Sequence, residues 1–121
     1  MANLVTSVNY GKNQKQILIG QDSYYIGLPI VLSGSANTTI YAGQPLTGDI
    51  EDRDTAFTAS TSSTKGILLH DVKLDADGKG NGTLVLAGCV DLLKLEDDVV
   101  TAIETAKADL PRIIFVKGSA I

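Results

Sequence analysis

Residues 66–95 constrain the fold of this chain more than any other stretch, and they read GILLHDVKLDADGKGNGTLVLAGCVDLLKL. Apolar runs at residues 67–69 and 84–86 flank a segment rich in Asp, Gly, Lys and Asn. Three glycines and an asparagine in that segment tolerate the positive φ angles that tight turns need. We therefore predict two strands joined by a turn, a unit that builds scaffold and brings no chemistry of its own.

The composition predicts one folded domain. The chain has 121 residues, of which 44% are hydrophobic, and this is enough for a modest single core. That core must be largely aliphatic, because the chain holds four Tyr, two Phe and no Trp. The 10 Lys and Arg stand against 14 Asp and Glu, and the net charge of −4 has the wrong sign for a phosphate backbone. We expect no nucleic-acid partner.

The cysteine count limits the disulfide and metal chemistry of the chain, and the hydropathy pattern limits where in the cell we expect it. Cys89 is the only cysteine, which excludes an intrachain disulfide and a multi-cysteine metal site, and its apolar neighbours predict a buried thiol. The beginning of the chain lacks a basic stretch followed by a long apolar run, as a secretory signal would have. No apolar stretch approaches the ~20 residues that cross a bilayer. We expect synthesis in the cytoplasm and no membrane partner.

Residues 1–16 read as a separate N-terminal arm. They are polar, and their larger apolar side chains are sparse: Leu4, Val5, Val8 and Tyr10. A segment of this kind buries too little surface to fold alone, so we expect a flexible arm or an edge strand that needs a partner. Residues 17–121 then form a single mainly-β domain.

Apolar residues alternate from Tyr24 to Leu32, which predicts a strand with one buried face. Pro29 cannot donate a ladder hydrogen bond, so this strand is expected at a sheet edge or at a bulge. A Ser/Thr-rich stretch within residues 48–64 is typical of an exposed loop.

Residues 96–109 predict one late α-helix. Three acidic residues begin it, where the helix dipole favours negative charge, and Pro111 ends it. Residues 113–116 form a last apolar run, which we interpret as a buried strand. The predicted buried face of the helix recurs at intervals of three and four residues, and it consists of Val99, Val100, Ile103, Ala106 and Leu110.

The chain offers few residues for catalysis. His70 is the lone histidine, so a Ser/His/Asp triad would have to use it. Its neighbour Asp71 does not form a pair by adjacency, because neighbours on a strand point to opposite faces. The glycines at 78, 80 and 82 are not followed by a helix that could hold a phosphate.

Two acidic stretches suggest chemistry, the first a calcium site and the second an acid/base pair, and neither pattern holds. The sequence from Asp75 begins like a calcium loop, but Lys79 and Leu86 stand at the fifth and twelfth positions, where oxygen ligands are required. Glu96, Asp97 and Asp98 splay outward in a first helical turn, so we expect a capping and dipole role. We predict no enzyme, no cofactor and no metal site.

The order of elements resembles the head decoration proteins of tailed bacteriophages, the group of the lambda decoration protein and the head-fibre base proteins. The resemblance covers about residues 24–118. It runs through two extended segments, YIGLPIVL and YAGQPLTGDI, then GILLHDV, an Asp/Gly-rich turn, GTLVLAGCVDLLKL, an acidic helix start and RIIFVKG.

That resemblance implies a β-clip-like, mainly-β small barrel or sandwich that assembles as a homotrimer. It also implies binding to the major capsid protein on the outside of an expanded capsid, so that the protein ends in the virion. The arm at residues 1–16 would add a strand to the capsid, with Leu4, Val5, Val8 and Tyr10 as the contact residues. The chain departs from the lambda protein in its arm sequence and in having no tryptophan.

Two other classes of function stay open. A surface adhesin or carbohydrate-binding module is suggested by the Ser/Thr-rich loop and the tyrosines, although the chain has no Trp for stacking on sugars. A hydrolase that uses His70 is the other, and the sequence shows no partnered nucleophile for it.

Overall fold

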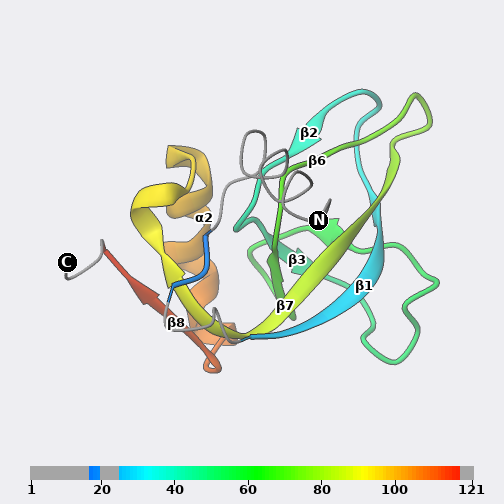
Figure 1. The fold of residues 1–121 in the computed structure, drawn as a ribbon. Coiled ribbons are helices and arrows are strands. Elements are labelled where there is room, and N and C mark those ends of the chain that lie inside the picture. Colours follow the sequence, from blue (N-terminus) through cyan, green and yellow to red (C-terminus); the bar gives the residue numbers. More distant parts are fainter. Residues whose placement is uncertain (1–16, 20–24, 118–121) are drawn as a thin grey trace, which may run out of the picture.

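The computed structural model describes residues 17–19 and 25–117, and in that part of the chain it shows a mainly-β fold with a single α-helix (Figure 1). The strands do not close into a barrel there, so of the two predicted shapes the sandwich is the one found. In chain order the elements are β1 (Ile26–Ser33), β2 (Thr39–Ile40), β3 (Pro45–Thr47), β4 (Thr58–Ala59), β5 (Gly66–Leu68), β6 (Val72–Lys73), β7 (Lys79–Asp91), the 3-10 turn η2 (Leu92–Lys94), α2 (Asp97–Ala106), the 3-10 turn η3 (Lys107–Asp109) and β8 (Ile113–Val116).

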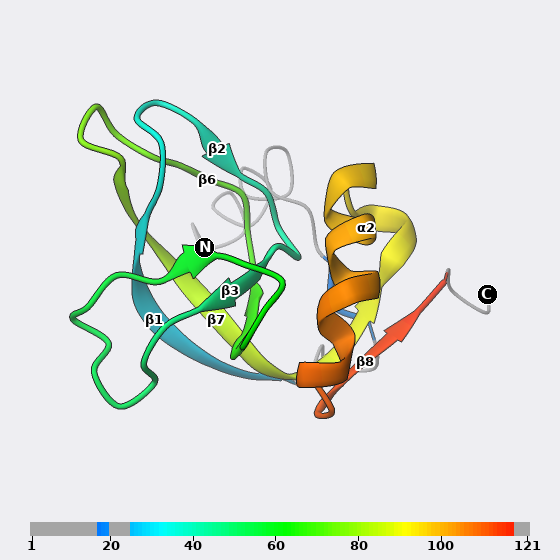
Figure 2. The same cartoon turned by 180° about the vertical axis from the view of Figure 1, so that it is seen from behind.

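The main sheet is organised around β7, a strand of 13 residues. Its strands run in the order β1-β7-β5-β3-β4, with β8 added to the far end of β7, and β2 and β6 form a separate two-stranded ribbon. Figures 1 and 2 show β1 and β7 as long curved ribbons lying side by side. Two segments that are far apart in the sequence therefore share the longest ladder of the molecule.

The predicted two-stranded unit is confirmed. β5 pairs antiparallel with β7, with Ile67 opposite Val85. The turn before β7 uses Gly78 at φ 75°, a conformation in which a side chain would be strained. Gly82, which the sequence placed in the turn, lies inside β7 instead, and a Cβ there would stand 2.8 Å from Leu68 Cδ1. That glycine is needed for close packing and not for turning the chain.

Gly88 divides β7 into two parts. Its φ of 151° lies in the region that glycine adopts freely, and the pairing of the strand changes there. Before Gly88 the strand pairs with β1 and β5, whereas from Gly88 onward it pairs in parallel with β8. On the opposite side Leu18 forms an antiparallel bridge with Val90. The end of β7 thus lies at the centre of a small sheet whose outer members are residues 17–19 and β8.

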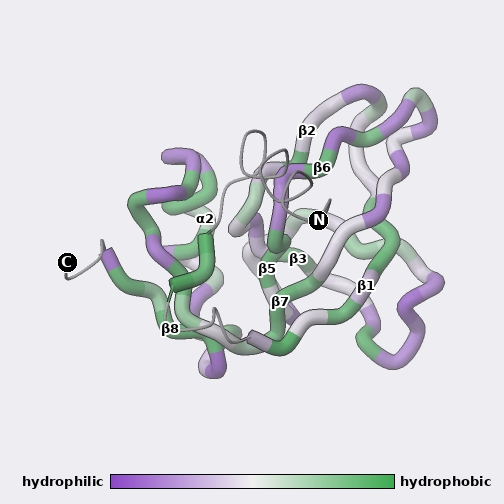
Figure 3. The backbone as a smooth tube through the Cα atoms, viewed as in Figure 1, coloured by the Kyte–Doolittle hydropathy of each residue, from purple (hydrophilic) through white to green (hydrophobic). Residues whose placement is uncertain are grey.

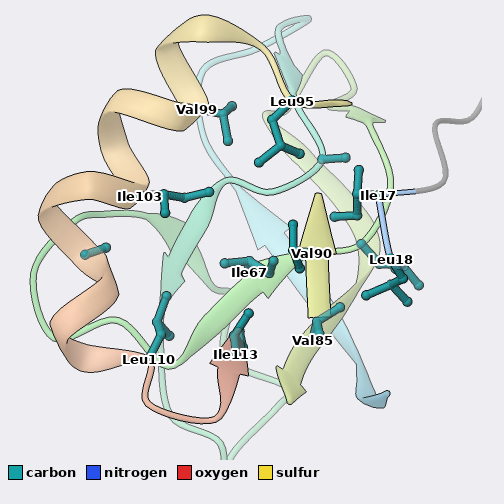
Figure 4. Close-up of a cluster of buried hydrophobic side chains, with 13 residues drawn as sticks. Ile17, Leu18, Ile67, Val85, Val90, Leu95, Val99, Ile103, Leu110 and Ile113 are labelled. Atoms are coloured by element: carbon teal, nitrogen blue, oxygen red, sulfur yellow. The ribbon is translucent and has the colours of Figure 1, made fainter. Parts of the chain in front are cut away.

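Alternation along β5 and β7 distributes side chains to two apolar clusters, one on each face. We call them the helix-side cluster, which receives Ile67 and Val85, and the strand-side cluster, which receives Leu68 and Leu84. Figure 4 shows side chains from α2, β5, β7 and β8 converging in the first. The helix-side cluster comprises Ile17, Leu18, Ala42, Ile67, Leu69, Val85, Val90, Leu95, Val99, Ile103, Ala106, Leu110 and Ile113. The strand-side cluster comprises Ile30, Leu32, Leu46, Phe57, Leu68, Leu74 and Leu84.

The late helix is confirmed, with α2 continued by η3 to Asp109. Val99, Ile103 and Ala106 are buried as predicted, while Val100 is only partly buried against the helix-side cluster. Among the described residues, no helix has the length and apolar character that crossing a bilayer requires.

The Ser/Thr-rich stretch predicted as an exposed loop is mostly exposed, apart from the buried Thr64. The residue just before it is a core residue that the sequence did not indicate. Phe57 is fully buried in the strand-side cluster. Its N–H donates to the Val31 carbonyl at 2.7 Å, and its carbonyl accepts from the Ser33 N–H at 3.0 Å. These two bonds fasten the middle of the loop along β1 and carry the ring inward. Figure 3 shows hydrophilic stretches in the long loop beyond β3.

Three expectations of burial were too broad. In the strand predicted from alternation, Ile30 and Leu32 are buried but Ile26 is 52% exposed, because the sheet covers only the later part of that face. Cys89 is half-buried rather than buried. In β8, predicted as a buried strand, Ile113 is buried while Ile114 is 62% exposed. Cys89 and Ile114 are ladder partners, and the face that they share is left partly open.

Candidate functional site

The structure does not join His70 to Asp71. His70 follows β5 in a bend, is half-buried, and its Nδ1 is buried without a hydrogen-bond partner. The Asp71 carboxylate instead accepts the Ala42 N–H at 2.7 Å, which holds the β2–β3 connection in place. Asp71 therefore serves the fold, and no hydrogen bond in the described part links it to the imidazole.

The predicted turn from Asp75 is built around that carboxylate. Asp75 Oδ1 accepts the backbone N–H groups of Asp77 and Lys79, both at 2.9 Å. The Lys79 N–H, and after it the Asp77 N–H, favour the charged form, so they hold the pKa of Asp75 below its usual value. An oxygen that receives two N–H donors is committed to closing a turn, as the hairpin interpretation expects.

The acidic stretch before α2 takes the dipole role but not the side-chain capping role predicted for it. Asp97 and Asp98 lie in the first turn of the helix. Glu96 is the N-cap residue and makes no side-chain cap hydrogen bond. Within the described residues, no three His, Cys, Asp or Glu side chains gather where they could hold a metal ion.

The predicted capsid-contact residues lie outside the described part of the chain. Leu4, Val5, Val8 and Tyr10 belong to residues 1–16, so the structure leaves that prediction open. What it does show is the segment that follows the arm: Ile17 and Ile19 bond to β7 through Asp91 N–H and Cys89 carbonyl, each at 2.9 Å.

A surface suited to binding another strand does occur in the described part, at β8. β8 pairs with β7 along one edge, and no described strand or helix pairs with the other edge. Figures 1 and 2 both place β8 at the periphery of the molecule. We call this open side the β8 edge, and its sequence, Ile-Ile-Phe-Val, carries no charge and no proline.

The register decides which backbone groups of β8 face outward. The Gly88 N–H donates to the Arg112 carbonyl at 3.3 Å, which starts the parallel ladder. Pairing then alternates, so Ile114 and Val116 direct their N–H and carbonyl groups toward β7. The residues between them direct theirs to the β8 edge.

Phe115 consequently presents both its N–H and its carbonyl at the β8 edge. Ile113 presents its carbonyl there, while its N–H already donates to the Leu110 carbonyl at 3.2 Å. By the same alternation the Lys117 N–H points outward. None of these four outward groups has a backbone partner among residues 17–19 and 25–117.

An apolar hollow of about 370 Å³ lies close to the same strand. Leu93, at its rim, is 66% exposed and with Ile114 is one of the two most exposed large apolar side chains described. Lys117, which directly follows β8, also lines this hollow. The full lining consists of Leu92, Leu93, Leu95, Asp97, Val100, Thr101 and Lys117. Backbone edge and hollow together offer what strand addition uses, main-chain hydrogen bonds and a place for a side chain.

The β8 edge was missed from the sequence. A continuous apolar run such as residues 113–116 is typical of a strand buried on both sides, and that was the interpretation given. The available signal was weaker: the run is the last element after the helix and is flanked by Arg112 and Lys117, a pattern that fits an outer strand.

Comparison of the sequence with protein-family models and with curated proteins finds no match to either.

Proposed function

We propose that this protein is a virion structural protein that binds the outer surface of a tailed-phage capsid as a trimer and stabilises the expanded head. The order of elements carries this proposal. The resemblance rests on a GIL strand, an Asp/Gly turn, a long strand, a helix with an acidic start and a final strand. In the structure these segments are β5, the Asp75 turn, β7, α2 and β8, folded into one body.

The exposed apolar side chains support a role in assembly. Ile26, Leu93 and Ile114 are each more than half exposed, in a chain whose net charge is only −4. A chain of 121 residues buries a modest core, and apolar surface buried between copies would add to the stability of the fold. An assembly of three copies would also carry three arms, and multivalent attachment raises avidity far above the affinity of one arm.

The arm supplies the proposed attachment mechanism. Residues 1–11 contain no charged side chain, and their β-branched and aromatic residues favour an extended conformation. Such a segment can add a strand to a sheet of the capsid protein, with main-chain hydrogen bonds giving affinity and alternate side chains giving specificity. Leu4, Val5, Val8 and Tyr10 are the side chains proposed to make that contact.

Binding to decoration-free capsids tests the mechanism. The double variant Leu4→Asp/Val8→Asp places charge at two proposed contacts and should abolish co-sedimentation with capsids. Asn9→Asp/Asn13→Asp adds the same charge to the same arm at polar positions and should bind nearly as the native chain does. Full occupancy by the first variant would move the contact surface onto the β domain and contradict the arm mechanism.

The assembly state is tested separately in solution. Light scattering at micromolar concentration should give three times the chain mass of 12.7 kDa. A mass of one chain at every concentration, together with no ordered contact on a capsid, would contradict the proposal of a trimeric decoration protein.

A further inference from the structure

We propose that the β8 edges of two copies of this chain pair antiparallel across a two-fold axis centred on Phe115. The starting observation is that no strand or helix of residues 17–19 and 25–117 pairs with the β8 edge, and that β8 itself carries no charge and no proline. Natural sheets usually protect such an edge with a charge, a proline, a bulge or a covering segment. An unprotected apolar edge is therefore expected to have a partner strand, and the backbone groups at this edge are self-complementary.

The register follows from the four outward groups. When Phe115 stands opposite Phe115 of the second copy, each donates its N–H to the carbonyl of the other. The Lys117 N–H of each copy then reaches the Ile113 carbonyl of the other. The four outward groups named above are satisfied in both copies, which gives four hydrogen bonds between the copies; the Lys117 carbonyl has no partner, because the Ile113 N–H opposite it already donates to Leu110.

The neighbouring symmetric register does not work as well. Centred on Ile114, it would place Ile113 opposite Phe115 of the second copy and would require an outward Ile113 N–H. That N–H donates to the Leu110 carbonyl at 3.2 Å within its own chain. In this register the Phe115 N–H of each copy still reaches the Ile113 carbonyl of the other, but the Phe115 carbonyl is left unmet and the Lys117 N–H lies beyond the opposing strand. Two hydrogen bonds therefore form instead of four, and each unmet backbone group in an apolar contact is costly.

Side chains and charges are compatible with the register centred on Phe115. Ile114 of one copy stands opposite Val116 of the other, so its exposed surface is covered by an apolar partner. Lys117 stands opposite Ile113, so no like charges face each other directly within residues 113–117. The occupant that fits this edge is a second copy of the same strand.

The strength of the contact follows from its size. A ladder of residues 113–117 with one exposed isoleucine falls short of the ~1,200 Å² that stable interfaces bury. We therefore infer weak pairing between single chains, which becomes effective when several edges act together. If the chain is the proposed trimer, three β8 edges would link neighbouring trimers; this extension rests on the proposed function, whereas the pairing itself does not.

Disulfide cross-linking reads the register directly. In a Cys89→Ala background, Ile114→Cys and Val116→Cys chains should form a disulfide dimer when mixed at high concentration under mild oxidation, because opposite non-hydrogen-bonded residues lie close enough to bridge. Neither chain should dimerise alone. Ile26→Cys, a similarly exposed apolar position on another strand, should not cross-link with Val116→Cys.

Other results would overturn the proposal. Self-cross-linking of Ile114→Cys alone would mean the register centred on Ile114. No cross-link in the mixture, or equal cross-linking by Ile26→Cys, would exclude pairing through β8. An intrachain disulfide between Val8→Cys and Ile114→Cys would assign the edge to the arm of the same chain.

A charge substitution checks the same contact without a disulfide. Ile114→Lys should remove the concentration-dependent association seen by sedimentation, while Ile26→Lys should leave it unchanged. Equal loss of association in both variants would indicate non-specific hydrophobic association and would overturn the specific pairing. Capsid binding by Ile114→Lys reports on the proposed function independently, since the arm proposed to attach is intact in that variant.

Discussion

The two apolar clusters share β5 and β7 as a common wall, yet they differ in what covers their outer strands, β1 and β8. In the strand-side cluster the last gap is filled by Phe57, whose backbone also covers part of the outer side of β1. Both clusters have partly buried side chains at the margin, Leu92, Val100 and Phe115 on one side and Ile40, Val72 and Leu86 on the other. The comparison teaches that the difference lies at the outer strands: the chain covers part of β1, whereas no described segment covers the outer side of β8.

The two outer strands show the same contrast. β1 contains Pro29, which has no N–H to offer, and the Pro29 carbonyl accepts from Arg53 Nη1 at 2.9 Å. Leu32 is bridged to Phe57 on the same side. These are devices that protect a sheet edge, and the β8 edge has none of them within the described residues.

The two phenylalanines of the chain offer the sharpest test of this contrast. Phe57→Ala should lower the free energy of unfolding by about 3–5 kcal/mol, because a fully buried ring is replaced by a cavity. Phe115→Ala, at the open margin, should cost clearly less when measured at a concentration too low for association. Denaturant unfolding of both variants decides, and equal losses would mean that the outer sides of β1 and β8 are covered to the same degree.

Substitutions at a buried, a partly buried and an exposed position of the helix test the helix-side cluster. Ile103→Ala should lower the free energy of unfolding by roughly 2–5 kcal/mol, since Ile103 lies on the buried face of α2 and is 1% exposed. Val100→Ala should cost less, because Val100 lies at the margin. Lys107→Ala should change stability little, since its ion pair with Glu104 is exposed. Equal effects of all three in thermal unfolding would show that the helix face is wrongly assigned.

A smaller effect is expected at the turn that leads into β7. The pKa of Asp75 is lowered in the folded state, so its contribution to stability is fully present above the unfolded pKa of about 3.9 and is lost as pH falls through the folded pKa. Asp75→Asn keeps an acceptor oxygen but cannot titrate. Between about pH 4 and the folded pKa, the free energy of unfolding of this variant should fall less than that of the native chain. Unfolding followed by circular dichroism at several pH values can measure the difference. An unchanged acid profile would assign that loss to other carboxylates.

The smallest expected effect is that of calcium, which should be none. Asp75 Oδ1 is occupied by two N–H donors, and positions five and twelve of the apparent loop are Lys79 and Leu86. Titration calorimetry should show no saturable heat at millimolar calcium. Binding that disappears in Asp77→Ala would contradict the turn assignment.

Several features were determined by the sequence alone, because they depend on neighbours along the chain. The apolar runs around the Asp/Gly segment predicted the β5–β7 pairing, and the spacing of Val99 and Ile103 with Pro111 beyond them predicted the helix and its buried face. Period and turn chemistry are local properties, and the tertiary structure left them intact.

Other features were decided only by the tertiary structure. Phe57 lies in a polar loop, and nothing near it in the sequence indicates that its backbone would bond to β1 and bury its ring. Residues 113–116 read as a buried strand, but among the described residues β8 has a strand partner on one edge only. Whether an apolar segment is covered depends on which distant segments reach it, and no local pattern contains that information.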